Sequence, residues 1–131
     1  MPNLVYYLYI WKMALHNQIG KKGEEEAVLY LLTLGATILE RNYRYDRAEI
    51  DIIAKIEDVI VFIEVKTRTQ NEHGNPEDFL SLAQQKRIVK AANYYLESIP
   101  ENLDIRFDII AIIKNKELEH IEDAFFLIGD D

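Results

Sequence analysis

Residues 49–66 of this chain read EIDIIAKIEDVIVFIEVK, two runs of isoleucine and valine separated by the polar pair Glu57-Asp58. Apolar runs of this length around a short polar pair are typical of two strands joined by a tight turn. We therefore predict an antiparallel hairpin with strands over about 48–56 and 59–67. Charged side chains interrupt the apolar runs at the strand ends far from the turn, at Glu49, Asp51, Glu64 and Lys66.

The register of this hairpin predicts which charged side chains face each other. If Glu57-Asp58 is the centre of the turn, Asp51 lies opposite Glu64, and Glu49 lies opposite Lys66. Two carboxylates in a cross-strand pair have Cβ atoms about 5 Å apart and repel each other. A divalent cation between them would remove this repulsion, and oxygen ligands favour Mg²⁺ or Mn²⁺ over zinc.

Lys66, next along the same face, would then be placed to orient an attacking water or to stabilise charge on a phosphoryl group. A second interpretation of the same residues needs no chemistry. Glu49 and Lys66 would form a surface ion pair worth about 0–1 kcal/mol, and Asp51 and Glu64 would point into water from an uncovered face of the sheet.

The elements around the hairpin predict an α/β fold. A helix is expected over 20–34, with Glu24 on its apolar face as a third candidate carboxylate, and a strand over 37–45. A second helix would begin after the Asn75-Pro76 cap and end near Ser98. A strand over 105–113 follows, and then a short final strand or tail. The order α-β-β-β-α-β indicates a mixed sheet flanked by helices.

Composition excludes several classes of protein. The chain has 131 residues, 49% of them hydrophobic, and no cysteine, which excludes a disulfide scaffold, a thiolate zinc site and a cysteine nucleophile. No apolar run is long enough for a membrane helix, so we expect a cytoplasmic protein without a membrane partner. The net charge of −8 discourages nucleic-acid binding, but residues 97–131 alone hold 10 acidic and 3 basic residues, which leaves room for a basic face elsewhere.

Length indicates one domain, which we assign to residues 13–131. Residues 1–12 form an N-terminal extension that need not belong to the core. Its aromatic and apolar run, Leu4 to Trp11, would be an extra strand or an interaction arm. Alternatively, Met13 is the natural start, and the extension is not native.

Four stretches in order resemble a known family. They are Gly20-Lys21-Lys22-Gly23-Glu24-Glu25-Glu26-Ala27, Arg41-Asn42-Tyr43-Arg44, Glu49-Ile50-Asp51, and Phe62-Ile63-Glu64-Val65-Lys66-Thr67-Arg68. Asp51 followed by Glu64-Val65-Lys66 resembles the signature of the PD-(D/E)XK nuclease superfamily. All four stretches together resemble the YraN-type uncharacterised bacterial family, which is similar to Holliday-junction resolvases. The one departure is Ala48, where the family often has glycine.

The resemblance implies a restriction-endonuclease-like core and a metal-dependent endonuclease that hydrolyses DNA phosphodiester bonds, with branched or junction DNA as one substrate form. Asp51 and Glu64 match the metal-binding carboxylates, Lys66 matches the catalytic lysine, and Glu24 matches the helix glutamate that completes the site. The implied cofactor is Mg²⁺ or Mn²⁺. The implied partner is nucleic acid, and DNA is the expected kind. Branched DNA usually needs two sites, which would make the protein a homodimer.

Weaker candidates surround this set. We expect nucleic-acid contacts from basic and polar residues on the strands and on the second helix, at Arg44, Arg68, Gln85 and Lys86. Asp108 is expected to be structural, with Arg106 or a loop as its partner. The alternative function is a non-catalytic nucleic-acid-binding or adaptor module that kept the nuclease fold, and the net acidity favours it.

Overall fold

The structure, a computed structural model, describes residues 3–8, 22–68, 80–113 and 117–125. Its main elements, in chain order, are α2 (Lys22–Thr33), β1 (Thr37–Tyr45), β2 (Ala48–Ile56), β3 (Val59–Arg68), α4 (Leu82–Glu97), β4 (Asp104–Ile113) and β5 (Glu119–Phe125). The five strands form one sheet in the order β1-β2-β3-β4-β5. β3 and β4 are parallel, and the other neighbours are antiparallel. The predicted mixed sheet is confirmed, and β5 completes it as a full edge strand.

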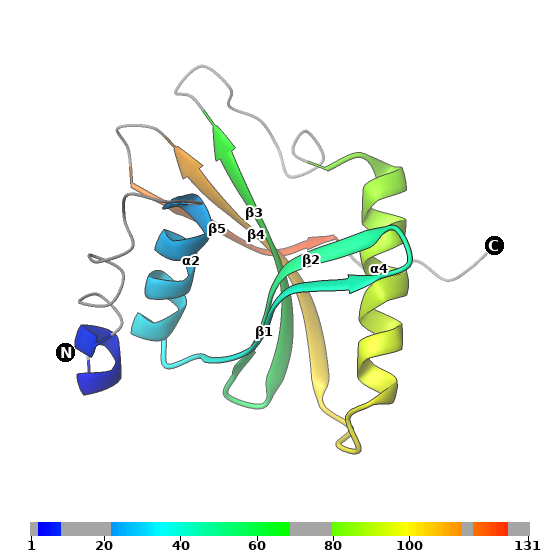
Figure 1. Cartoon of the computed structure of the whole chain (residues 1–131), viewed down its shortest axis with the longest axis horizontal. Coiled ribbons are helices and arrows are strands. Elements are labelled where there is room, and N and C mark those ends of the chain that lie inside the picture. The colour runs from blue at the N-terminus through cyan, green and yellow to red at the C-terminus, as the bar shows by residue number, and fades with distance from the viewer. Residues whose placement is uncertain (1–2, 9–21, 69–79, 114–116, 126–131) are drawn as a thin grey trace.

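Helices α2 and α4 lie on opposite sides of this sheet (Figure 1). On the α2 side, Ala27, Val28 and Leu31 pack with Ile52 and Ile63. On the α4 side, a second cluster joins residues of the helix to all of the central strands, namely Ile88, Ala91, Ala92, Ile53, Phe62, Phe107 and Ile109. The alternation of buried residues along β3 and β4 therefore serves two cores, as expected for strands covered on both faces.

Helix α2 ends as its sequence predicts. Gly35 has φ +82°, a conformation that glycine adopts without steric cost. Its N–H donates to the Leu32 carbonyl, and the Ala36 N–H donates to the Leu31 carbonyl, both at 3.1 Å. This double contact is a Schellman motif. It turns the chain directly into β1 and keeps the helix against the sheet.

The predicted start of the second helix is wrong. Ser81, not Asn75, is the N-cap: its side chain accepts from the Gln84 N–H, and the Gln84 side chain accepts from the Ser81 N–H in return. This capping box satisfies two backbone donors at once, so the helix begins at Leu82. Asn75 and Pro76 lie outside the described residues.

The N-terminal run differs from the predicted extra strand. Residues 4–8 are helical, with the Tyr6 N–H donating to Asn3 Oδ1 at 3.0 Å. Leu4 is 71% exposed and Leu8 57% exposed, so these described residues add little to the core. Residues 9–21 lie outside the described part, and the domain boundary at residue 13 stays a prediction. No helix among the described residues is long and apolar enough to cross a membrane.

Candidate active site

The predicted carboxylates meet where the pairing of β2 with β3 ends. The hairpin has the predicted register, with Ile53 opposite Phe62, and its last ladder pair before the site is Ile52 with Ile63. Beyond that pair, β1 and β2 turn away from β3 toward α4 (Figure 1). Asp51 and Glu64 are the first residues past the end of the ladder, one on each of the separating strands.

Each of these two carboxylates bonds to the backbone of the other strand. The Val65 N–H donates to Asp51 Oδ2 at 2.8 Å, and the Asp51 N–H lies 3.4 Å from Glu64 Oε1, a long and weak contact. Side chains therefore replace the backbone ladder at this point. The two acids are thus held beside each other by the strands, rather than turned into water as the structural interpretation required.

Burial makes this pair reluctant to ionise. Glu64 is only 8% exposed, and burial, followed by the charge of Asp51, raises its pKa to about 8. Burial also raises the pKa of Asp51 to about 6, with Glu24 and Glu49 adding to the effect, while the bond from Val65 opposes it. Two neighbouring acids, one buried and one half-buried, that disfavour their charged forms are typical of a functional site.

Lys66 and Glu24 act on the same pair. The Lys66 ammonium lowers the pKa of both Asp51 and Glu64, which places its charge near both carboxylates. Glu24 on α2 is among the charges that raise the pKa of Asp51, so the third predicted carboxylate also lies near the site. The four predicted site residues thus come together from three elements, α2, β2 and β3.

Glu49 does not follow the prediction that it pairs with Lys66. Its Oε2 accepts from Nε of Arg44 at 2.7 Å, because Arg44 is its direct neighbour in the β1–β2 ladder. The Arg44 side chain is 79% exposed, and the pairing leaves it at the surface. The charge of Lys66 therefore acts on Asp51 and Glu64, while Glu49 pairs with Arg44.

The donor set suits a hard divalent cation. Asp51 and Glu64 offer only oxygen atoms, and Mg²⁺ is commonly bound by one or two carboxylates with water and substrate phosphate filling its other positions. A cation would also favour the ionised forms of both acids, whose pKa values are raised mainly by burial. Within the described ranges, no group of three or more His, Cys, Asp or Glu side chains has the geometry of a metal centre. The residues that would hold a cation here are Asp51 and Glu64.

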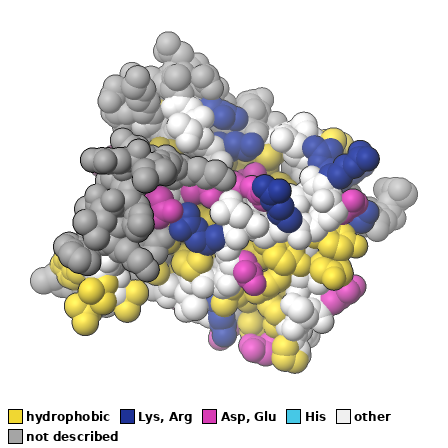
Figure 2. Space-filling view, viewed as in Figure 1, with side chains coloured by type: hydrophobic (Ala, Val, Ile, Leu, Met, Phe, Trp, Pro, Cys, Tyr) yellow, Lys and Arg dark blue, Asp and Glu magenta, His cyan; other side chains and the backbone are white. Residues whose placement is uncertain are grey.

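The candidate nucleic-acid contacts divide into two groups. Lys86 is exposed on α4, and Arg68 lies at the end of β3, just past the site, where its guanidinium donates to the Thr67 carbonyl at 3.0 Å. Gln85 instead serves the fold, because its Nε2 donates to the Leu80 carbonyl at 3.2 Å before the start of α4. On the face shown in Figure 2, lysine and arginine side chains lie on several sides of a central acidic group.

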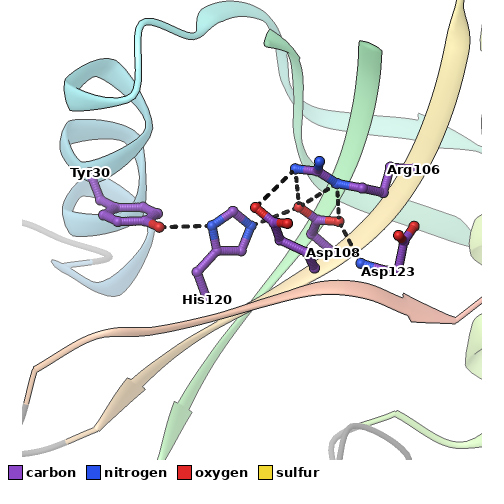
Figure 3. Close-up of polar contacts among 6 residues, drawn as sticks. Tyr30, Arg106, Asp108, His120 and Asp123 are labelled. Atoms are coloured by element: carbon purple, nitrogen blue, oxygen red, sulfur yellow. Dashed lines mark hydrogen bonds and ion pairs between the residues drawn. The ribbon is translucent and has the colours of Figure 1, made fainter.

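A second buried polar cluster lies between α2, β4 and β5 (Figure 3). Asp108 is fully buried, and Arg106 donates to both of its oxygens. His120 lies 2.7 Å from it, the Asp123 N–H donates to it, and the Tyr30 hydroxyl bonds His120 at 2.8 Å. Burial by itself would raise the pKa of Asp108, but the bonds from His120 and Arg106 outweigh it and lower that pKa.

This cluster confirms Asp108 as structural, with Arg106 as its partner. The roles of His120 and Tyr30 escaped the sequence analysis, because the three residues that meet lie on three different elements. The only local signal was the Arg106-Phe107-Asp108 spacing, which puts both charges on one face of a strand. The cluster ties β5 to the sheet and α2 to β5.

The fold is that of a restriction-endonuclease-like protein. It resembles the solved structure of Hjc from Archaeoglobus fulgidus, a Holliday junction resolvase from an archaeal hyperthermophile. The TM-score is 0.54 with 14% sequence identity, over 78% of this chain and 74% of that chain. At this identity the likeness is one of fold.

The chain belongs to uncharacterised protein family UPF0102, whose family model matches residues 23–112. A UPF0102 protein of Christiangramia forsetii is 55% identical, over 87% of this chain and 98% of its own length. A UPF0102 protein of Clostridioides difficile is 46% identical, over 81% of this chain and 95% of its own. These matches confirm the family expected from the four sequence stretches.

Proposed function

We propose that this protein is a divalent-metal-dependent endonuclease that hydrolyses DNA phosphodiester bonds, with branched DNA as its preferred substrate form. One observation carries the proposal. Two carboxylates, the buried Glu64 and the half-buried Asp51, lie side by side where two strands separate, both with raised pKa values and with the Lys66 charge beside them. A structural ion pair would lower those pKa values instead.

Each of the four site residues would have its own role in hydrolysis. Asp51 and Glu64 would hold Mg²⁺ or Mn²⁺, which supplies Lewis-acid stabilisation of the phosphate and a more acidic bound water. The Lys66 ammonium would orient the attacking water or stabilise the charge that develops on the phosphoryl oxygens. Glu24 would add negative charge near the cation and strengthen its binding.

DNA as the substrate is supported by the fold and by the surface. The similar solved structure is that of a Holliday junction resolvase. Basic side chains at the surface near the site, Arg44 and Arg68, with Lys86 on α4, would contact phosphates without reading sequence. A junction presents two strands for cleavage, so this substrate favours two copies of the chain acting together.

Single-turnover cleavage tests the proposal. The substrates are a four-way junction, a flap, a duplex and a single strand, each as DNA and RNA, with Mg²⁺, with Mn²⁺ and with chelator. Lys66→Ala should lower the rate on the order of 10²–10³-fold, while DNA affinity changes little because one phosphate contact is a small part of the total.

Lys55→Ala is the matched control. Lys55 lies on β2 near the turn, opposite Ile60, and pairs with Glu101 at 3.9 Å, so its loss should leave cleavage unchanged. A Lys66→Ala protein that cuts as fast as wild type would refute the mechanism. If the wild type binds DNA and cuts none of the substrates, the adaptor function replaces the enzyme.

A further inference from the structure

The first turn of α2 approaches β3 more closely than a side chain permits. A Cβ atom placed on Gly23 would lie 2.8 Å from Oγ1 of Thr67 and 3.6 Å from Cγ1 of Ile112. The first distance is shorter than any normal contact of a Cβ atom. Glycine at residue 23 therefore allows the start of the helix to rest on the end of β3, one residue beyond Lys66.

The same turn is fastened to β1 on its other side. Nη2 of Arg41 lies 2.8 Å from Oε1 of Glu25, and both side chains are only 31% exposed. Arg41 is the ladder partner of Ile52, the residue next to Asp51. This partly buried ion pair fixes the helix start to the strand that borders β2.

These two contacts straddle the strand that carries Asp51. β2 lies between β1 and β3 in the sheet, residue 23 contacts β3, and residue 25 contacts β1. Successive helix residues are about 100° apart, so Glu24 falls between the two contacts and on the same face as the buried Ala27 and Val28. Its side chain is therefore directed at the sheet near β2.

Holding Glu24 there needs an anchor. Its carboxylate carries the same charge as ionised Asp51, so in the absence of a cation these two acids push the helix start away from the site. The positive end of the helix dipole offsets this only in part. The close approach at Gly23 and the ion pair at Glu25 are the contacts that oppose the displacement.

We propose that Gly23 and Arg41 are positioning residues that hold the first turn of α2 astride β2, so that Glu24 stays beside Asp51 and strengthens divalent-cation binding. The inference rests on the proposed function, because it assumes a cation held by Asp51 and Glu64. It assigns Arg41 to the architecture of the site rather than to phosphate contact.

The test is Mn²⁺ affinity by calorimetry, with the melting temperature of each metal-free variant measured alongside. Gly23→Ala should weaken Mn²⁺ binding on the order of 10-fold, as the loss of an outer supporting group does, and Glu24→Gln should weaken it similarly. Thr67→Ala alone should change nothing. The double variant Gly23→Ala/Thr67→Ala removes the clashing Oγ1 and should restore the affinity to about that of wild type.

The Glu24→Gln protein shows whether Gly23 affects Mn²⁺ binding through Glu24. If Gly23 acts through Glu24, then Gly23→Ala should have no further effect on Mn²⁺ affinity in the Glu24→Gln protein. A general loss of structure would weaken binding in both backgrounds and would lower the melting temperature, and either result would overturn the inference.

Arg41 supplies a second test that does not depend on Gly23→Ala folding. Removing a positive charge near a cation site should tighten cation binding if electrostatics alone acts. Arg41→Ala should instead weaken Mn²⁺ binding, and Arg41→Lys should preserve most of it. Tighter binding in Arg41→Ala would refute the positioning role of Arg41.

Two outcomes separate this inference from the proposed function. If wild-type binding of Mn²⁺ is lost in Asp51→Asn but is unaffected by Gly23→Ala and Arg41→Ala, only the positioning role fails. Unchanged affinity in Gly23→Ala alone would refute the positioning role of Gly23. If the wild type binds no Mn²⁺ that depends on Asp51, both proposals fail together.

Discussion

Replacing Glu64 by glutamine should stabilise the metal-free protein, and it should do so only at neutral to alkaline pH. The pKa of Glu64 rises from 4.5 to about 8 on folding, so the folded state retains a proton that the unfolded state releases. Because the native state binds more protons, the free energy of unfolding falls as pH rises from about 4.5 to 8. It levels off above pH 8, where Glu64 is ionised in both states.

The size of the effect follows from the same values. One pKa unit corresponds to about 1.4 kcal/mol, which bounds the cost of ionising Glu64 at about 4–5 kcal/mol. Partial access of solvent and the coupling to Asp51 reduce what one substitution recovers, and we expect about 1–3 kcal/mol. That corresponds to a rise of about 3–10 °C in melting temperature at pH 8.5 for a chain of this size.

Thermal unfolding in chelator, at pH 5 and at pH 8.5, measures this difference. Glu64→Gln and wild type should melt much closer together at pH 5 than at pH 8.5, because at pH 5 the loss of stability that begins near pH 4.5 is only a small part of its full size. Glu97→Gln, on the exposed face of α4, is the matched control and should follow wild type at both values. If Glu64→Gln is no more stable than wild type at pH 8.5, Glu64 is not a buried acid that resists ionisation beside Asp51.

Three further predictions concern the metal, the second polar cluster and the N-terminus. Mn²⁺ at 100 times its dissociation constant should stabilise wild type by about 2.7 kcal/mol, and calorimetry should show no such gain in Asp51→Asn, which would itself be slightly more stable without metal. Asp108→Asn should cost about 3–5 kcal/mol in denaturant unfolding, since Arg106 and His120 lose a buried charged partner. Glu122→Gln, whose side chain is 62% exposed and lies 3.7 Å from Arg106, should cost under about 0.5 kcal/mol; an equal loss in both would contradict the role of the buried carboxylate. Deleting residues 1–12 should leave the melting temperature nearly unchanged, and a loss of more than a few degrees would show that this run packs on the core.

The hairpin register was predictable because its determinants are local. Glu57 adopts φ +55°, a turn conformation that suits a short polar reversal, and the apolar runs on both sides admit one alignment. Ile53 lies opposite Phe62 as expected. The meeting of Asp51 with Glu64 followed from that alignment, and the raised pKa values followed from their apolar neighbours.

The end of the ladder was not predictable, because it depends on contacts far along the chain. β1 and β2 turn toward α4, where Tyr45 stacks on Tyr94 with ring centroids 4.0 Å apart and Tyr43 meets Tyr95 edge to face at 5.2 Å. Nothing within the hairpin specifies these partners. The strands therefore separate at Asp51 for a reason that lies in α4, and the separation turns a cross-strand pair into an open site.

The place of β5 explains how an acidic chain can accommodate an anionic substrate. Its exposed acids, Glu119, Glu122 and Asp123, lie on the edge strand, with β4 between them and β3. Two strand spacings amount to about 10 Å, which is about one Debye length at 0.1 M salt. At that ionic strength these charges are partly screened from the site, whereas Lys66 and Arg68 lie on β3 itself. The net charge of −8 therefore opposes DNA binding at the Asp51–Glu64 site much less than the sequence total suggests.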